Sequence, residues 1–303
     1  MNAASRPVHR RPTLVQSEDA QGKALAEDRS IGQLISETKN LTEDEIQKIV
    51  AYQQEHGLRF GEAAVSLGFA TDADVVFALS QQFQYPYTPE NRRDVSREVV
   101  AAAQPFSQQA EAFRAIRAQL MMRVYSPNEP KRALAVLSPE SGDGKSFFVA
   151  NLGVVLAQLG GRTLVVDANM RNPRQHSIFQ VPNTSGLSGI LSGRQEENVI
   201  FQAPDIPSLF VMPVGVTPPN PMELLERPAF RLLLGELLRK FDHVVVDTPA
   251  AFTGADAVVI ASKCGAALTI ARKDKSSVSS LQALLGTLSS SSTKLVGTVF
   301  NEF

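Results

Sequence analysis

A glycine-rich stretch in the middle of the chain combines the residue types that bind phosphate groups. It consists of Gly142, Asp143, Gly144, Lys145, Ser146 and Phe147. The apolar run 133–137 before it predicts a buried strand, and the apolar-periodic run 147–159 after it predicts a helix. Amides at a helix N-terminus attract anions, a lysine there reaches the β- and γ-phosphates, and a serine hydroxyl binds Mg²⁺. The stretch therefore predicts a P-loop for a nucleotide such as ATP.

The loop departs from the common P-loop pattern at its first position. The usual pattern places a glycine six residues before the lysine, where this chain has Pro139. Proline fixes φ and has no N–H to donate, so the loop must begin differently. Taken alone, the stretch is also compatible with an ordinary strand-to-helix turn that contains serine and glycine.

Two aspartates that follow apolar runs favour the nucleotide interpretation. Asp167 ends the run 164–167, and Asp247 ends the run 244–247. Continuous Val/Leu runs are typical of parallel strands that are buried on both faces. A P-loop needs a carboxylate at the end of a neighbouring parallel strand to hold the Mg²⁺ shell. We therefore predict that both aspartates lie beside Lys145, as catalytic and metal-binding residues.

The composition of the chain excludes several classes of protein. Its 303 residues carry a net charge of −1, which argues against a dedicated nucleic-acid binder, and 43% are hydrophobic, as in ordinary globular proteins. Cys264 is the only cysteine, which fits a reducing compartment, and we expect it to be a small core residue. No apolar stretch is long enough to span a bilayer, and the basic N-terminus lacks the apolar segment of a secretory signal.

We predict four regions and an α/β fold class. Residues 1–27 are expected to be a disordered tail, 28–88 a helical tandem-repeat domain, 89–109 a linker and 110–303 a P-loop domain. The P-loop domain should have a parallel sheet with helices on both faces, and the domain before it should be small and all-helical. The leucine-rich run 223–241 predicts one helix that packs against the sheet.

The helical region contains a repeat with a period of 29 residues. Gly32 recurs as Gly61 (61 − 32 = 29), and the helix cap Thr42 recurs as Thr71 (71 − 42 = 29). Each unit predicts a short helix, a turn and a longer helix. Because one unit of this size cannot bury a core, we expect the two units to pack together.

This repeat resembles the N-terminal domain of type II secretion ATPases, some of which bind cyclic di-GMP through tandem motifs. The second unit matches the motif at Arg59, Gly61, Gly68 and Gln82. The first unit departs from it, because Ser30 replaces the arginine and Lys39 replaces the later glycine. The resemblance implies a second-messenger site at the four matching positions. The alternative is a docking or assembly domain that keeps the pattern for packing.

Further motifs accompany the P-loop in the second part of the chain. They are Glu111-x-x-Arg114-x-x-Arg117, Asp167-x-Asn169-x-Arg171, residues 186–193, residues 218–225 and Asp247-Thr248-Pro249. In this order they resemble the cytoplasmic bacterial tyrosine kinases of polysaccharide export, and more narrowly the chain-length determinant protein tyrosine kinases of exopolysaccharide clusters. The resemblance covers about two-thirds of the chain, from residue 111 to residue 301.

The resemblance implies a protein tyrosine kinase that uses ATP and Mg²⁺. Lys145 and Ser146 would bind phosphate and Mg²⁺. Asp167 would orient Mg²⁺ or take the hydroxyl proton, because Asn169, an amide, cannot act as a base. Asp247 would hold the metal shell. Asn301 stands where related ATPases contact the adenine base, although a strand-end cap is an equal alternative.

The resemblance also implies an assembly. Glu111, Arg114 and Arg117 match the helix through which such kinases form rings, so a homo-oligomer is expected; a solvated ion-pair ridge is the alternative. The implied partner is a membrane-embedded polysaccharide chain-length regulator. The implied location is the cytoplasm, at the periphery of the inner membrane.

The tyrosines depart from the family pattern. These kinases usually phosphorylate a cluster of tyrosines in their tail, whereas the last tyrosine here is Tyr125. Tyr125, Tyr85 and Tyr87 are candidate substitutes. Two alternatives to a kinase therefore stay open, namely an ATP-dependent regulatory switch with little kinase activity and a second-messenger binding module.

Overall fold

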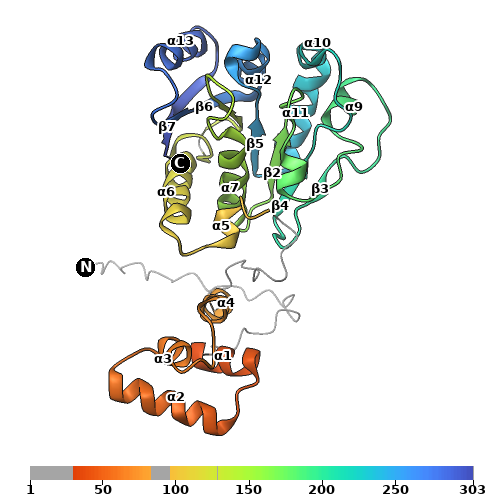
Figure 1. Cartoon of the computed structure of the whole chain (residues 1–303). Helices are drawn as coiled ribbons and strands as arrows, with labels where there is room; N and C mark the ends of the chain where they lie inside the picture. Colours follow the sequence, from red (N-terminus) through yellow and green to blue (C-terminus); the bar gives the residue numbers. More distant parts are fainter. Residues whose placement is uncertain (1–29, 83–95, 128, 303) are drawn as a thin grey trace, which may run out of the picture.

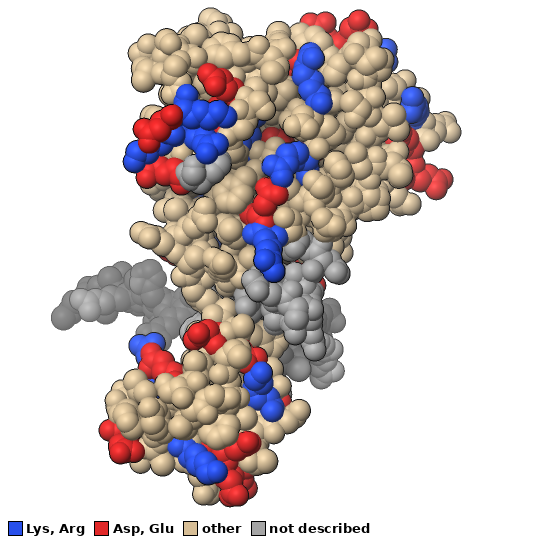
Figure 2. Space-filling view, in the orientation of Figure 1, with Lys and Arg blue, Asp and Glu red and all other residues tan. Residues whose placement is uncertain are grey.

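The computed structural model describes residues 30–82, 96–127 and 129–302 (Figure 1). Residues 30–82 contain helices only, and residues 96–302 contain a sheet that is covered by helices. Within the described residues, no helix is both long and apolar enough to cross a bilayer. On the face seen in Figure 2, acidic and basic residues are interspersed, in keeping with the net charge of −1.

The sheet has seven strands in the order β3-β4-β2-β5-β1-β6-β7. The strands are β1 (Ala133–Leu137), β2 (Thr163–Asp167), β3 (Phe201–Gln202), β4 (Leu209–Met212), β5 (His243–Asp247), β6 (Gly265–Arg272) and β7 (Lys294–Asn301). All neighbouring strands pair in parallel except the short edge strand β3, which is antiparallel to β4. The predicted parallel α/β fold is confirmed, and all five residues of β1, β2 and β5 are buried.

Helices cover both faces of this sheet (Figure 1). They are α5 (Val100–Ala103), α6 (Gln108–Arg123), α7 (Lys145–Ala157), α8 (Gln175–Ile178), α9 (Leu187–Leu191), α10 (Pro221–Glu226), α11 (Pro228–Lys240), α12 (Asp256–Cys264), α13 (Val278–Ser289) and the 3-10 turn Ala251–Thr253. The alternation of side chains divides the core. Leu134 and Val136 pack with α5, α6 and α7, whereas Ala133, Ala135 and Leu137 pack with α10 to α13.

Part of the range assigned to a linker is packed into the sheet domain. Val99 and Ala101 are fully buried in the core beneath α7. The side chain of Asn151 in α7 accepts a hydrogen bond from the Ala101 amide and donates one to the Glu98 carbonyl oxygen, each at 2.9 Å. Residues 96–109 are therefore part of this domain, and residues 83–95 lie outside the described part of the chain.

The leucine-rich helix predicted over 223–241 is wrong in its extent. The structure has two helices there, α10 and α11, because Arg227 is extended (φ −54°, ψ 146°) and Pro228 starts a new helix. An extended residue before proline avoids the clash that helical geometry would cause there. Leu232 is 71% exposed, so not every leucine of this run is a core residue.

The N-terminal unit consists of four helices with polar caps. They are α1 (Ile31–Lys39), α2 (Glu43–His56), α3 (Phe60–Ser66) and α4 (Asp72–Gln82). Thr42 caps α2 in a reciprocal box with Glu45, and Thr71 pairs in the same way with Asp74 at α4. The ion pair between Lys39 and Asp74 (2.7 Å) joins the end of α1 to the start of α4. Both predicted repeat units thus contribute to one small core, which includes Ile35, Ile49 and Ala78.

Candidate functional site

Strand β1 leads into the predicted P-loop, and α7 begins at its lysine. Gly144 caps α7 with a φ of 94°, a left-handed conformation that glycine adopts without strain. Lys145 is buried, and its Nζ donates to Ser138 Oγ (2.8 Å) and to the Glu140 carbonyl oxygen (3.3 Å). Burial lowers the pKa of Lys145, and nearby carboxylates act against this effect. The ammonium group is thus fixed in orientation and only partly compensated, as an anion-binding site requires.

The two predicted carboxylates lie side by side at one edge of the sheet. Asp167 ends β2 and Asp247 ends β5, and they are register partners in the parallel β2–β5 pairing. β5 also pairs with β1, where Val136 is the partner of Asp247. Since β1 feeds the P-loop, both carboxylates come to the loop, and the nearby Ser146 side chain lowers the pKa of Asp247.

The two carboxylates differ in their hydrogen bonds. Asp167 accepts bonds from the backbone amides of Asn169 (3.1 Å), Arg174 (2.9 Å) and Gln175 (2.9 Å). Asp247 Oδ2 accepts a bond from Gln175 Nε2 (2.8 Å), whereas Asp247 Oδ1 is buried and has no partner among the described residues. Asp167 is therefore fixed by the backbone, and Asp247 keeps an oxygen available to a ligand.

Electrostatics favour a cation between these groups. Burial raises the pKa of Asp167, and the neighbouring charge of Asp247 raises it further against the three amide bonds. Burial also raises the pKa of Asp247, while Gln175, Ser146 and Lys145 lower it. Two buried carboxylates in contact repel each other unless a proton or a cation compensates them.

Gln175 is a site residue that no sequence pattern singles out. Its Nε2 donates to Asp247 Oδ2 (2.8 Å) and to the Ser146 carbonyl oxygen (3.0 Å), and it thereby links β5 to the P-loop. Gln175 is fully buried. The one available signal is its place in the polar turn after β2, a short distance beyond Asp167.

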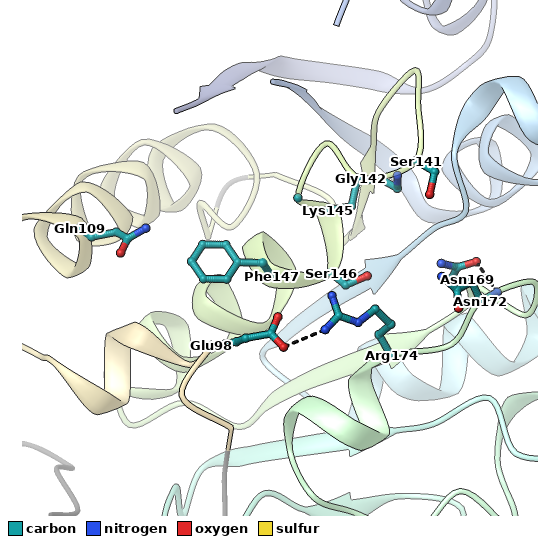
Figure 3. Close-up of a pocket in the computed structure, with 11 residues that line it drawn as sticks. Glu98, Gln109, Ser141, Gly142, Lys145, Ser146, Phe147, Asn169, Asn172 and Arg174 are labelled. Carbon is teal, nitrogen blue, oxygen red and sulfur yellow. Dashed lines mark hydrogen bonds and ion pairs between the residues drawn. The ribbon is translucent and has the colours of Figure 1, made fainter. Parts of the chain in front are cut away.

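A pocket of about 480 Å³ opens beside the P-loop (Figure 3). Its walls are Glu98, Gln109, Ser141, Gly142, Gly144, Lys145, Ser146, Phe147, Asn169, Asn172 and Arg174. Arg174 reaches across to Glu98 in an ion pair of 2.7 Å, which Figure 3 shows below Ser146. Glu98, Gln109 and Arg174 have no motif in the sequence, because they meet only through the fold.

The donor set fits Mg²⁺ that is bound together with a nucleotide. Within the described residues, no group of three or more His, Cys, Asp or Glu side chains could hold a metal by itself. Mg²⁺ usually binds through one or two carboxylates, waters and substrate phosphates. The Ser146 hydroxyl, Asp167 and the unpaired Asp247 Oδ1 supply such oxygens beside the amides of the loop.

Comparisons with known proteins agree with this geometry. The family model "CobQ/CobB/MinD/ParA nucleotide binding domain" matches residues 134–303. CapB of Staphylococcus aureus is 36% identical over 198 residues, which are 65% of this chain and 86% of that protein. The tyrosine-protein kinase YwqD of Bacillus subtilis is 30% identical over 207 residues, which are 68% of this chain and 86% of that protein. The chain belongs to the bacterial tyrosine-protein kinases.

The solved structure of the kinase domain of the Escherichia coli tyrosine kinase ETK supports the same assignment. It superposes with a TM-score of 0.65 and 30% sequence identity over 71% of this chain and 84% of that chain. The predicted family is thus confirmed for the P-loop domain. The resemblance of the N-terminal helical unit to type II secretion ATPases stays a prediction.

Two further predicted residues of this kinase are Asp143, within the P-loop, and Asn301, which contacts it. Asp143 is fully buried; its carboxylate accepts bonds from the Glu140 amide (2.9 Å) and from Ser276 Oγ (3.0 Å). Asn301 Nδ2 donates to the Asp143 carbonyl oxygen (3.2 Å). The structure therefore brings Asn301 to the loop from the end of β7, and its contact with a base stays a prediction.

The loop after β2 is tied to α12 by an ion pair. Arg171 Nε and Nη2 donate to the two carboxylate oxygens of Asp256 at 3.0 and 3.3 Å. Asp256 is 1% exposed. The side chain of Asn169, in the same loop as Arg171, accepts a bond from the Asn172 amide (3.2 Å) and lines the pocket.

The residues predicted for oligomerisation lie on α6, and none of them is among the pocket walls named above. Arg114 Nε forms an ion pair with Glu111 Oε2 (2.7 Å), and the Glu111 side chain is 70% exposed. Arg117 Nη1 donates to the Val155 carbonyl oxygen on α7 (2.7 Å). Arg117 thus already has a role inside the kinase, whereas Glu111 faces solvent.

The residues predicted for a second messenger belong to α3, to its two flanking turns and to α4, and a joint ligand site stays a prediction. Gly61 is buried, and a Cβ there would lie 2.8 Å from a methyl group of Val75, so close helix packing explains the glycine. Gly68 has a φ of 75° and no atom near its Cβ position. Arg59 precedes α3, where its amide donates to Glu62 (2.9 Å). Gln82 ends α4, and its side chain lies outside the described part.

Of the three candidate phosphoacceptor tyrosines, the structure describes only Tyr125. The side chain of Tyr125 is half-buried, its hydroxyl donates to the Val244 carbonyl oxygen (3.4 Å), and burial raises its pKa. Its ring stands edge-on to His243 at a centroid distance of 4.9 Å. A hydroxyl turned toward the core is a poor acceptor for its own kinase site. Tyr85 and Tyr87 lie outside the described residues.

Proposed function

We propose that this kinase transfers the γ-phosphoryl group of Mg·ATP to tyrosine hydroxyls and thereby regulates exopolysaccharide chain length and export. The observation that carries the proposal is the register pairing of Asp167 with Asp247 beside the P-loop. Only the folded sheet brings these acids together, and they meet at the lysine and serine that bind phosphate in P-loop proteins.

The residues of the chain divide the work of phosphoryl transfer. Lys145, which Ser138 and the Glu140 carbonyl hold in place, offsets charge on the β- and γ-phosphates. Ser146 and Asp247 provide oxygens for the metal. Bound Mg²⁺ would supply charge neutralisation on the phosphates.

Asp167 is the proposed acceptor of the tyrosine proton. A bond forms between the tyrosine oxygen and the γ-phosphorus, the bond to the β–γ bridging oxygen breaks, and ADP leaves. Three backbone amides fix the Asp167 carboxylate, which suits a group that must hold one position relative to the acceptor. The neighbouring Asn169 can hydrogen-bond to the phosphates but cannot take a proton.

Detection of phosphotyrosine by mass spectrometry after incubation with Mg·ATP tests the proposal. We expect phosphotyrosine on the wild-type chain or on an added tyrosine peptide, and at least about 100-fold less with Lys145→Met, because a catalytic charge that acts in the transition state is lost. Hydrolysis of ATP without phosphotyrosine on any acceptor would instead identify a regulatory switch ATPase.

We further propose a homo-oligomer through the helix that carries Glu111, Arg114 and Arg117, and a membrane-embedded chain-length regulator as the partner. The support is the motif order of the sequence and the exposure of Glu111. The kinase would then work in the cytoplasm at the inner membrane. Co-purification of the kinase with the regulator from membranes tests this, and recovery of the kinase in the soluble fraction only would contradict it.

For residues 28–88 we propose a separate docking domain. The packing role of Gly61 against Val75 favours docking over cyclic di-GMP binding. Calorimetry of the full chain with cyclic di-GMP tests the alternative, because heat that disappears in Arg59→Ala would restore the second-messenger prediction.

A further inference from the structure

Four consecutive carbonyl oxygens of the P-loop accept hydrogen bonds from side chains, three of which come from distant parts of the chain. The Glu140 oxygen accepts bonds from Ser138 Oγ (2.8 Å) and Lys145 Nζ (3.3 Å). The next three oxygens each have one donor: Lys275 Nζ for Ser141 (2.8 Å), Arg272 Nη1 for Gly142 (3.3 Å) and Asn301 Nδ2 for Asp143 (3.2 Å). Four consecutive carbonyl groups are thus held in a fixed direction.

Fixed carbonyl groups also fix the amides that bind an anion. The peptide unit is planar and trans, so the N–H of each residue points away from the carbonyl oxygen of the residue before it. The side chains that donate to the carbonyl oxygens of residues 140–143 therefore turn the N–H groups of residues 141–144 to the opposite side. In the described part of the chain these four amides have no hydrogen-bond partner. Ser141, Gly142 and Gly144 line the pocket, where a phosphate group can accept their bonds.

The donors are themselves held in place. Ser276 Oγ donates to the Asp143 carboxylate (3.0 Å) and accepts from the Arg272 amide (2.8 Å), so the turn after β6 is fastened to the loop. The Lys273 amide donates to the Asn301 carbonyl oxygen (3.0 Å), which joins this turn to the end of β7. The turn and the strand end form one rigid support behind the P-loop.

Gly142 permits this contact. Its φ is 81°, and a Cβ there would lie 2.7 Å from Lys275 Nζ. Any side chain at this position would therefore displace the lysine from the loop as well as strain the backbone.

We propose that Arg272, Lys275 and Asn301 are positioning residues that set the P-loop amides in their phosphate-binding orientation before the nucleotide arrives. The inference deepens the proposed function and rests on the nucleotide site described above. These residues act on the phosphates through the loop backbone. They increase the affinity for phosphate groups, because the loop amides do not have to reorient when the nucleotide binds.

Calorimetric titration of the full-length chain with Mg²⁺ and inorganic tripolyphosphate, which has no base or ribose, tests the proposal. We expect Arg272→Met and Lys275→Met each to raise the dissociation constant about 5-fold and the double variant more than about 20-fold, as loss of one or two hydrogen bonds from charged donors implies. Lys273→Met is the matched control. It removes the same charge from the same turn, but Lys273 pairs with Glu302 (3.2 Å), so its affinity should stay at the wild-type value.

Further variants separate positioning from bulk charge and from base recognition. Lys275→Arg should restore most of the affinity, because it can donate to the same carbonyl group. Asn301→Ala should weaken tripolyphosphate as well as ATP. If Asn301 only contacts the base, ATP binding falls and tripolyphosphate binding does not, which would remove Asn301 from the proposal.

Kinetics and amide exchange provide independent readouts. A loss of pre-set amides removes binding shared by ground and transition states, so KM for ATP should rise with little change in kcat. Hydrogen exchange of the Glu140 amide, which donates to Asp143 Oδ2 (2.9 Å), should accelerate in the ligand-free double variant, but not in Lys273→Met.

Unchanged tripolyphosphate affinity in the double variant, or an equal loss in Lys273→Met, would overturn the inference. Neither outcome would affect the proposed kinase. Absence of tripolyphosphate binding to the wild-type chain would instead refute both the nucleotide site and the inference built on it.

Discussion

Asp167 and Asp247 carry similar charge at the same sheet edge but contribute differently to stability. Each oxygen of Asp167 accepts backbone bonds, whereas Asp247 has one oxygen without a partner in the described structure. We expect Asp167→Asn to lower the free energy of unfolding by about 2 kcal/mol, because an amide nitrogen would face backbone donors.

For Asp247→Asn we expect a loss below about 1 kcal/mol, although phosphotyrosine formation should fall at least as far as in Asp167→Asn. Urea unfolding of both variants, together with the mass-spectrometric assay, makes the comparison. Equal destabilisation of the two variants would show that the unpaired oxygen is satisfied in solution.

The Arg171–Asp256 pair is the second residue-scale test. Asp256 is almost fully buried, and Arg171 is the cation that compensates it at 3.0 Å. Removal of one partner of a buried pair leaves an uncompensated charge, so Arg171→Met should cost about 2 kcal/mol.

The double variant Arg171→Met/Asp256→Leu should be less destabilised than the sum of the two single variants. A double-mutant cycle by urea unfolding measures this coupling, and additive effects would contradict a direct interaction.

At the scale of elements, the repeat of the N-terminal unit hides an asymmetry. Gly32 and Gly61 occupy equivalent positions in α1 and α3, yet a Cβ at Gly32 would lie 3.4 Å from the Phe60 ring and a Cβ at Gly61 only 2.8 Å from Val75. We expect Gly61→Ala to destabilise the unit by about 1–2 kcal/mol through overpacking.

Gly32→Ala is the matched control, and it should be neutral or stabilising by up to about 1 kcal/mol, because alanine favours the helix. Hydrogen exchange of residues 60–66 in the full chain measures both effects. Equal protection in the two variants would show that α3 shifts to accept the methyl group.

The contact between α1 and α4 should give the unit a pH dependence. Burial raises the pKa of Asp74, but the hydrogen bonds from Lys39 and Thr71 outweigh it, and the pKa lies below its ordinary value. A group with a depressed folded-state pKa stabilises the fold above its unfolded pKa of about 4, and this contribution is lost as the pH falls below that value and through the lower folded-state pKa.

NMR of the buried Ala78 methyl group in urea series at several pH values follows this loss. The acid-side decline should be reduced in Asp74→Asn and should persist in Asp72→Asn, which removes a carboxylate from the same turn. A decline of wild-type size in Asp74→Asn would exclude the pair as its cause.

Elements were predictable where local signals were sufficient. β1, β2 and β5 are buried on both faces and therefore have continuous apolar runs, which the sequence shows. The caps Thr42 and Thr71 marked helix starts. The break before Pro228 was missed because the leucine spacing continues across it. The packed segment 96–109 was missed because its alanines have no amphipathic period; Asn151 and α7 position it.

At the scale of the whole molecule, α6 combines a contact inside the subunit with a face that we predict to serve assembly. Glu111 is exposed, so Glu111→Ala should reduce self-association with less than about 0.5 kcal/mol change in stability. Arg117 holds the Val155 carbonyl of α7, so Arg117→Ala should cost about 1 kcal/mol within each subunit.

Sedimentation velocity and urea unfolding on the same preparations distinguish these effects. Unchanged self-association in Glu111→Ala would refute the predicted oligomer helix.

The fold class and the meeting of the P-loop with the two aspartates were predictable, because Lys145, Asp167 and Asp247 each follow a strand whose type the sequence reveals. The sequence did not predict the pocket walls Glu98 and Arg174 or the bridging residue Gln175. Their partners are set by the strand order and by turns without periodic sequence, and the same is true of the donors behind the loop.

The central position of β1 has a consequence for how the protein is made. β1 is synthesised first among the strands, but its two neighbours are β5 and β6, which begin at residues 243 and 265. A nascent chain on the ribosome therefore carries an apolar strand with both edges bare, and bare edges recruit other chains. We therefore expect the nascent kinase to be most exposed to aggregation until β6 emerges.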